Sequence, residues 1–246
     1  IGSLIIAGPS VILGPRLAKA YVDNRIEVYY SELKLSIKII LLCVVPVAIV
    51  LIIFTIPSIE LVFERGEFSK FDTVKMSNLL PFMIVGMVAM VNVVILFRAL
   101  FAKDNYKIPA ILGATCAISY FLLSGIFSNL FGGVGIALAY ALTWWLVFFV
   151  TLWLTFHGQF DQNDLYNTSV FFVKLVIVCS LTGIIVYGLS LFFIKPMIDV
   201  GWLILFINSS MIVIFGSVVY FFIGIRILHF EEMIFLYNSI LKKVYK

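Results

Sequence analysis

The chain has 246 residues, of which 63% are hydrophobic and only 12% charged, and its mean hydropathy is +1.16. A water-soluble domain is about half apolar and about a quarter charged, so this composition excludes a soluble globular protein. The formal net charge of +4 is small and the basic residues are spread over many polar segments, which disfavours nucleic acid as a partner.

The apolar residues come in runs long enough to cross a bilayer as helices, which takes about 20 residues at ~1.5 Å each. The alternating segments of a transmembrane barrel do not occur. We therefore predict an all-α polytopic membrane protein with six complete spans, at residues 36–56, 76–101, 109–128, 134–156, 170–194 and 201–225.

Shorter and more polar segments surround these spans. Residues 1–14 are apolar but too short to span, and we interpret them as the end of a truncated transmembrane helix. Residues 15–35 predict a cytoplasmic loop, as a surface segment or a short interfacial helix, and residues 226–246 predict an amphipathic tail. The spans within 36–156 are expected to form a bundle of four, and residues 157–225 a terminal pair.

The basic residues indicate the orientation of the chain. If the tail is cytoplasmic, four of the 17 Lys and Arg residues fall on the outer side, namely Arg65, Lys70, Lys75 and Lys195. Because positively charged loops remain on the cytoplasmic side of a membrane, the distribution predicts a cytoplasmic C-terminus.

Small residues predict one close pair of helices. The glycines Gly132 and Gly133 fit a tight helix–helix turn better than a phosphate-binding loop, which would be longer and followed by Lys. Gly135, Ala137, Ala139 and Ala141 follow at the spacing that lets two membrane helices approach closely.

No group of residues has the spacing of a catalytic or metal site. His157 and His229 lie on different connections, without Cys or carboxylates at ligand spacing. The three cysteines, Cys43, Cys116 and Cys179, each lie inside an apolar run and are expected to pack as small hydrophobic residues. We therefore predict no catalytic residue, no metal and no cofactor, and a chain that is not an enzyme.

Two polar residues within one span are candidates for transport or gating. Arg98 lies near the end of the span, where a charge is costly unless it reaches headgroups, water or protein. Extension of its side chain to the cytoplasmic surface is the simpler interpretation, and contact with a substrate phosphate or a gate is the alternative. Asn92 lies mid-span, where an interhelical hydrogen bond is the simpler interpretation and cavity lining the alternative.

Further candidates lie in the two polar turns on either side of this span. Glu64, Arg65 and Gly66 belong to a turn that we expect to be held by local ion pairs among Glu64, Arg65 and Glu67, with a gating contact as the alternative. Asp104 belongs to the second turn. The prolines Pro46, Pro81 and Pro109 are candidate hinges, because proline removes a helical hydrogen bond and kinks the helix.

The residues of these two turns carry a family resemblance. Phe63, Gly66, Phe68 and Asp72 occupy the positions of a [LF]-F-x-x-G-x-F turn followed by Ser/Thr and Asp. The segment 98–104, with a proline five residues on, looks like an R-x-F-Y-A-x-x-D-x-x-x-P motif that lacks its tyrosine. In these motifs the chain resembles the MurJ/MviN family of lipid II flippases, in the MOP flippase superfamily.

The resemblance implies a partial MOP/MATE-like bundle, consisting of most of the second lobe and the terminal helix pair. It implies a flippase of the bacterial inner membrane that moves undecaprenyl-pyrophosphate-linked peptidoglycan precursor to the outer leaflet by alternating access. The implied partners are this lipid, membrane lipids, the missing N-terminal half of the same protein, and cell-wall synthesis proteins.

The cationic cavity residues of the family lie outside this sequence, so we do not expect the chain to flip lipid alone. Two alternatives stay open. One is another lipid-linked polysaccharide flippase, or an ion-coupled exporter, of the same superfamily. The other is a non-transporting membrane scaffold.

Overall fold

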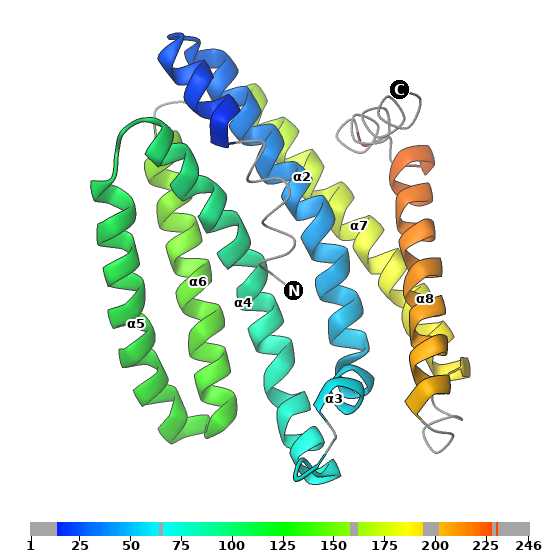
Figure 1. Ribbon diagram of the computed structural model, residues 1–246. Helices are drawn as coiled ribbons and strands as arrows, with labels where there is room; N and C mark the ends of the chain where they lie inside the picture. Colours follow the sequence, from blue (N-terminus) through cyan, green and yellow to red (C-terminus); the bar gives the residue numbers. More distant parts are fainter. Residues whose placement is uncertain (1–13, 64–65, 158–161, 194–201, 228–229, 231–246) are drawn as a thin grey trace. The chain divides into compact units, whose positions relative to one another are not determined.

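The computed structural model describes residues 14–63, 66–157, 162–193, 202–227 and 230 (Figure 1). Within these ranges the chain is helical almost throughout and contains no strand. The helices are α2 (Ile26–Ile53), α3 (Thr55–Phe63), α4 (Lys70–Ala102), α5 (Lys107–Phe131), α6 (Gly133–Phe156), α7 (Gln162–Phe193) and α8 (Trp202–Phe222), followed by the π-helical turn η2 (Ile223–Ile227).

The described part of the chain contains 6 helices that are long and apolar enough to cross a membrane. This finding confirms the prediction of six spans and the all-α fold class. The segments 1–13 and 231–246, which include most of the predicted truncated helix and tail, lie outside the described residues.

Several helices extend beyond their predicted ends. Residues 14–22 are helical and α2 already begins at Ile26, so the segment 15–35 is mostly helical. Helix α4 has 33 residues, which at ~1.5 Å each is about 50 Å, longer than the ~30 Å hydrocarbon core. The ends of such a helix extend past the hydrocarbon and can carry the polar residues that hydropathy assigned to loops.

The helices form two compact units. One contains the chain up to Val44 and from Leu79 onward through α6, and the other contains Val45–Asn78 and the chain from Gln162. The division therefore runs within α2 and within α4, and a third division before Gln162 lies close to the boundary that the sequence predicted between residues 156 and 157.

In the first unit, α5 and α6 pack side by side as an antiparallel pair (Figure 1). Gly132 alone joins them, with φ +59°, a left-handed conformation that favours glycine. A Cβ added to Gly135 would lie 1.9 Å from the carbonyl oxygen of Phe127, so only glycine allows this approach. The predicted tight turn is confirmed.

Small residues on α6 also allow close contact with α4. A Cβ on Gly86 would lie 2.9 Å from the Cα of Ala141 and 2.7 Å from the Tyr140 ring. Ala137, Ala139 and Ala141 are all buried. The prediction that the small residues of this segment permit close helix approach is therefore confirmed.

In the second unit, α7 and α8 pack against each other. A Cβ on Gly216 of α8 would lie 2.6 Å from Cγ2 of Val186 on α7, which shows how closely the two backbones approach. Val186 also forms an apolar cluster with Phe54 and Ile212. The cluster joins the chain after α2 to the terminal helix pair.

Candidate functional site

A cluster of polar and aromatic side chains in the first unit lies where the C-terminal end of α4 meets the N-terminal end of α2. The Lys103 ammonium donates a hydrogen bond to Tyr30 Oη at 2.7 Å. The same ammonium lies 4.8 Å from the centre of the Tyr29 ring and 4.4 Å from that of Tyr30. A cation close to two aromatic rings is stabilised by their quadrupoles.

Further aromatic rings extend this cluster to α6. Tyr29 and Tyr30 stand edge to face at 5.2 Å between centroids, and Tyr30 lies 5.8 Å from Phe156 at the end of α6. Tyr29 is completely buried. The cluster thus connects three helix ends of the first unit, and it places a positive charge at the polar end of the helix bundle.

Tyr29 also completes the hydrogen bonding at the end of α4. Its Oη donates to the main-chain carbonyl of Ala99 at 2.6 Å. The N–H of Lys103, the usual partner of that carbonyl in an α-helix, donates instead to Leu100 O at 3.1 Å. The tyrosine hydroxyl therefore satisfies a carbonyl that the end of the helix leaves without its usual donor.

Asp104, a predicted transport candidate, ends α4. It has φ +55°, its N–H donates to Phe101 O at 3.0 Å, and the N–H of Asn105 donates to Leu100 O at 3.1 Å. These two bonds define a Schellman motif with Asp104 in the left-handed position, which Asp and Asn tolerate better than most residues. The Asp104 side chain is exposed and accepts a hydrogen bond from Tyr106 Oη at 3.2 Å.

The other two candidates on α4 differ in exposure. Arg98 is half-buried near the C-terminal end of the helix, as expected for a charge near the membrane boundary. Asn92 is 1% exposed, and its Nδ2 donates to Val88 O of the same helix at 2.8 Å. Its Oδ1 has no hydrogen-bond partner among the described residues, so the structure does not show the predicted interhelical bond.

The turn between α3 and α4 is held by local contacts. Gly66 has φ +63°, and the rings of Phe63 and Phe68 lie 6.1 Å apart on either side of it. One carboxylate oxygen of Asp72 accepts hydrogen bonds from the N–H and the Oγ of Ser69, at 3.0 and 2.7 Å, in the manner of a capping box. Glu64 and Arg65, and with them the predicted ion pairs, lie outside the described residues.

The three candidate hinge prolines occupy different positions. Pro46 lies inside α2 and Pro81 inside α4. Pro109 is buried in the first turn of α5, where the absent N–H has no helical acceptor to lose, so its position favours a helix start over a hinge. Among the described residues, no three His, Cys, Asp or Glu side chains gather as a metal site would require.

Sequence reasoning missed the role of Tyr29 and Tyr30. Hydropathy does not show which residue 73 positions away an aromatic side chain will meet, as Tyr30 meets Lys103. The available signal was the pair of adjacent tyrosines at the start of a span, which is typical of a membrane boundary.

The chain is similar in sequence to a known family of membrane proteins. The profile of the family described as "Lipid II flippase MurJ" matches residues 2–221 of the chain. The chain belongs to the MurJ family. This membership confirms the predicted resemblance, and it confirms a membrane transporter family rather than an enzyme family.

Individual relatives agree with the family match. The chain is 24% identical over 230 residues to the probable lipid II flippase MurJ of Buchnera aphidicola subsp. Schizaphis graminum, covering 92% of this chain and 44% of that protein. It is 27% identical over 230 residues to the corresponding protein of Buchnera aphidicola subsp. Acyrthosiphon pisum, covering 90% of this chain and 44% of that protein. The chain thus spans less than half the length of these relatives.

A solved structure shows the same fold. A lipid II flippase MurJ in an inward closed conformation aligns with a TM-score of 0.64 at 21% identity, covering 91% of this chain and 45% of that one. The match confirms a partial MurJ-like helical bundle. Together with the family match and the 6 long apolar helices among the described residues, it indicates a multi-pass membrane protein.

Proposed function

We propose that the chain is the C-terminal part of a flippase that moves lipid II from the cytoplasmic to the outer leaflet of a bacterial inner membrane. The observation that supports this proposal is the family match over residues 2–221, which reaches each of the six long apolar helices that the structure describes. The activity is proposed for a polypeptide that includes this chain, because the chain spans only 44% of its relatives.

We further propose that transport proceeds by alternating access, with bending at Pro46 and Pro81. The chain passes between its two compact units after Val44 and again after Asn78, and each proline lies within one helical turn of such a point. A helix interrupted by proline lacks one main-chain hydrogen bond, so it bends there at the lowest cost. Hinge motions of this kind need only a few residues.

Arg98 is our candidate for a contact with the pyrophosphate of the lipid. It is the half-buried guanidinium of α4, and guanidinium binds phosphate oxygens in a bidentate geometry that ammonium does not reproduce. Asn92, whose buried Oδ1 has no hydrogen-bond partner in the described part of the chain, is a second candidate for a polar group that lines a transport path.

For the orientation we propose a cytoplasmic C-terminus, since only four of the 17 basic residues then lie outside. Reporter enzymes that are active on one side of the membrane, fused after residue 246, test this placement. Activity of an externally active reporter would contradict it.

A flipping assay in vesicles tests the transport proposal. The vesicles contain the polypeptide that carries this chain in its native membrane. Fluorescent lipid II is placed in one leaflet, and its appearance in the other leaflet is followed. Pro46→Ala and Pro81→Ala should slow the movement, while Pro109→Ala, in the first turn of a helix, should not. Equal movement of an unrelated lipid-linked oligosaccharide would favour the polysaccharide flippase, and no movement of either lipid would favour the scaffold.

The same assay separates the roles of Arg98. Arg98→Lys keeps the charge but loses the bidentate geometry, and Lys107→Ala serves as a control at an exposed basic position near the same membrane boundary. If Arg98 contacts pyrophosphate, Arg98→Lys slows lipid II movement and Lys107→Ala does not. Unchanged movement with Arg98→Lys would leave Arg98 with a boundary role only.

A further inference from the structure

Lys103 and Tyr30 place two hydrogen-bond donors side by side at one end of the first unit. The Lys103 ammonium donates to Tyr30 Oη at 2.7 Å, so the two polar atoms are in direct contact. An ammonium has three N–H donors, and in the described part of the chain Tyr30 Oη is the acceptor of one of them. The hydroxyl accepts this bond and therefore keeps its own proton to donate. The pair thus has N–H and O–H groups left for a further acceptor.

Aromatic rings hold this pair in place. The ammonium lies 4.8 Å from the centre of the Tyr29 ring and 4.4 Å from that of Tyr30. Tyr29 is fixed by its own hydrogen bond to Ala99 O at 2.6 Å, and the Tyr30 ring lies 5.8 Å from that of Phe156. Because these contacts already order the two side chains, binding of a ligand costs little further side-chain entropy.

The charge of Lys103 is not taken up by a neighbouring carboxylate. Asp104, the next residue, accepts a hydrogen bond from Tyr106 Oη at 3.2 Å. Within the described ranges no carboxylate forms an ion pair with Lys103. Lys103 and Tyr30 are both half-buried, so the pair is partly open to the surface. These features favour an anion as the missing acceptor.

The pair lies at the level of the lipid headgroups. Tyr30 precedes the apolar run that begins at residue 36, and Lys103 follows the run that ends at residue 101. Phe101 and Tyr106, on either side of Lys103 in the chain, are both exposed and stack at 5.6 Å. Exposed aromatic residues of this kind are typical of the membrane boundary. The anionic group that every phospholipid carries at this level is its phosphate.

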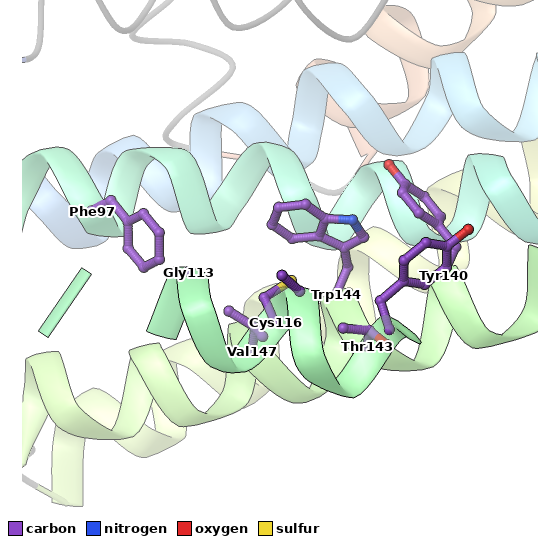
Figure 2. A pocket seen from close by; sticks show the side chains of 9 residues that line it. Phe97, Gly113, Cys116, Tyr140, Thr143, Trp144 and Val147 are labelled. Carbon is purple, nitrogen blue, oxygen red and sulfur yellow. The ribbon is translucent and has the colours of Figure 1, made fainter. Parts of the chain in front are cut away.

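The cavity of the first unit does not provide another place for such a group. It has a volume of about 330 Å³ and lies between α4, α5 and α6, where Figure 2 shows Phe97, Cys116 and Trp144 in its lining. All 9 residues that line it are uncharged. Because an unpaired charge is costly in such surroundings, an anion is better placed at the end of the bundle.

From these observations we infer that Lys103 and Tyr30 form a binding site for the phosphate group of a membrane phospholipid. The ammonium and the hydroxyl each donate to a phosphate oxygen, and the positive charge of Lys103 offsets the negative charge of the phosphate. Lysine binds phosphate in this way as a point charge, with strong charge-assisted hydrogen bonds. The inference concerns the lipids that surround the protein and does not depend on transport of lipid II.

Lipid binding in a neutral detergent tests the inference. Native mass spectrometry counts the lipids bound to the purified polypeptide that carries this chain. The probes are dioleoylphosphatidylglycerol and dioleoylglycerol, which share their chains and differ in the phosphate-containing headgroup. Inorganic phosphate and lipid II serve as competitors. We expect saturable binding of dioleoylphosphatidylglycerol, and at least about tenfold weaker binding of dioleoylglycerol, which lacks the charged acceptor.

Variants assign the binding to this pair. Lys103→Met should weaken binding of dioleoylphosphatidylglycerol about tenfold, the effect of one hydrogen bond from a charged group. Tyr30→Phe should weaken it about fivefold, because the ring stays and one donor is lost. Lys103→Arg, which keeps the charge and the donors, should retain the affinity. Lys107→Met, at an exposed basic position just after the same turn, should leave it unchanged.

Four results would overturn the inference. Equal affinity of the two probes would mean that the phosphate makes no contact. Equal losses with Lys103→Met and Lys107→Met would mean a general attraction of acidic lipid to a basic surface. Displacement of the phospholipid by inorganic phosphate at equal concentration would indicate a site for a soluble anion. Displacement by lipid II at a much lower concentration would assign the site to the transported lipid instead.

Discussion

Tyr29 near the start of α2 donates a hydrogen bond to the carbonyl of Ala99 near the end of α4, with 2.6 Å between the two oxygens. The two residues are 70 positions apart in the chain. The bond therefore fixes the register of two neighbouring helix ends in the first unit. It also supplies a donor to a carbonyl that the end of α4 leaves without its helical partner.

Tyr29→Phe removes this bond and leaves the buried carbonyl without a donor. We expect a loss of about 1–2 kcal/mol in the free energy of unfolding, seen as a lower unfolding temperature in detergent. Tyr106→Phe is the matched control, since that tyrosine is exposed and donates to Asp104 at 3.2 Å. Equal effects of the two substitutions would contradict the capping role of Tyr29.

Lys103 combines a hydrogen bond with two cation–π contacts, and the variants can separate them. Lys103→Met keeps the length of the side chain but loses the charge, and we expect it to cost about 1–2 kcal/mol. Tyr30→Phe loses only the hydrogen bond and keeps the ring, so the loss should be smaller. The measurement is again thermal unfolding, with Lys107→Met at an exposed position as the control. A larger loss for Tyr30→Phe than for Lys103→Met would rule out the cation–π contribution.

Gly66 occupies a left-handed conformation with open space around it, φ being +63°. Gly66→Ala is therefore expected to destabilise the protein by about 1 kcal/mol through backbone strain alone. In contrast, Gly125→Ala lies inside α5 with no atom near its Cβ, and it should be neutral or stabilising because alanine favours a helix. The unfolding temperature of Gly66→Ala should therefore be lower than that of Gly125→Ala. The opposite order would contradict the strain at Gly66.

Gly86 tests helix packing rather than backbone strain. Its Cβ in Gly86→Ala would meet the Tyr140 ring at 2.7 Å and the Ala141 Cα at 2.9 Å, and the main chain of α6 cannot rotate away. We expect a loss of about 1–3 kcal/mol from overpacking. Gly188→Ala, on α7 with nothing within 4 Å, is the control. A tolerated Gly86→Ala would mean that α4 and α6 separate more easily than their packing suggests.

Much of the fold could be predicted from the sequence. The number of spans depends on the length of each apolar run compared with the thickness of a bilayer, and that comparison needs no tertiary contact. The turn at Gly132 and the close approach at Gly135 follow from glycine itself, because a Cβ would be strained in the one position and would collide in the other. The family was also accessible, since its motifs are local.

Only the tertiary structure shows which contacts the polar residues make. Sequence alone marked Asp104 as a candidate for transport, and the main-chain bonds around it show a helix cap. It marked Asn92 for a bond between helices, and the bond lies within α4. The partners of Lys103 were invisible in the sequence. They depend on which helices lie side by side, and hydropathy along the chain carries no information about contacts between residues far apart in it.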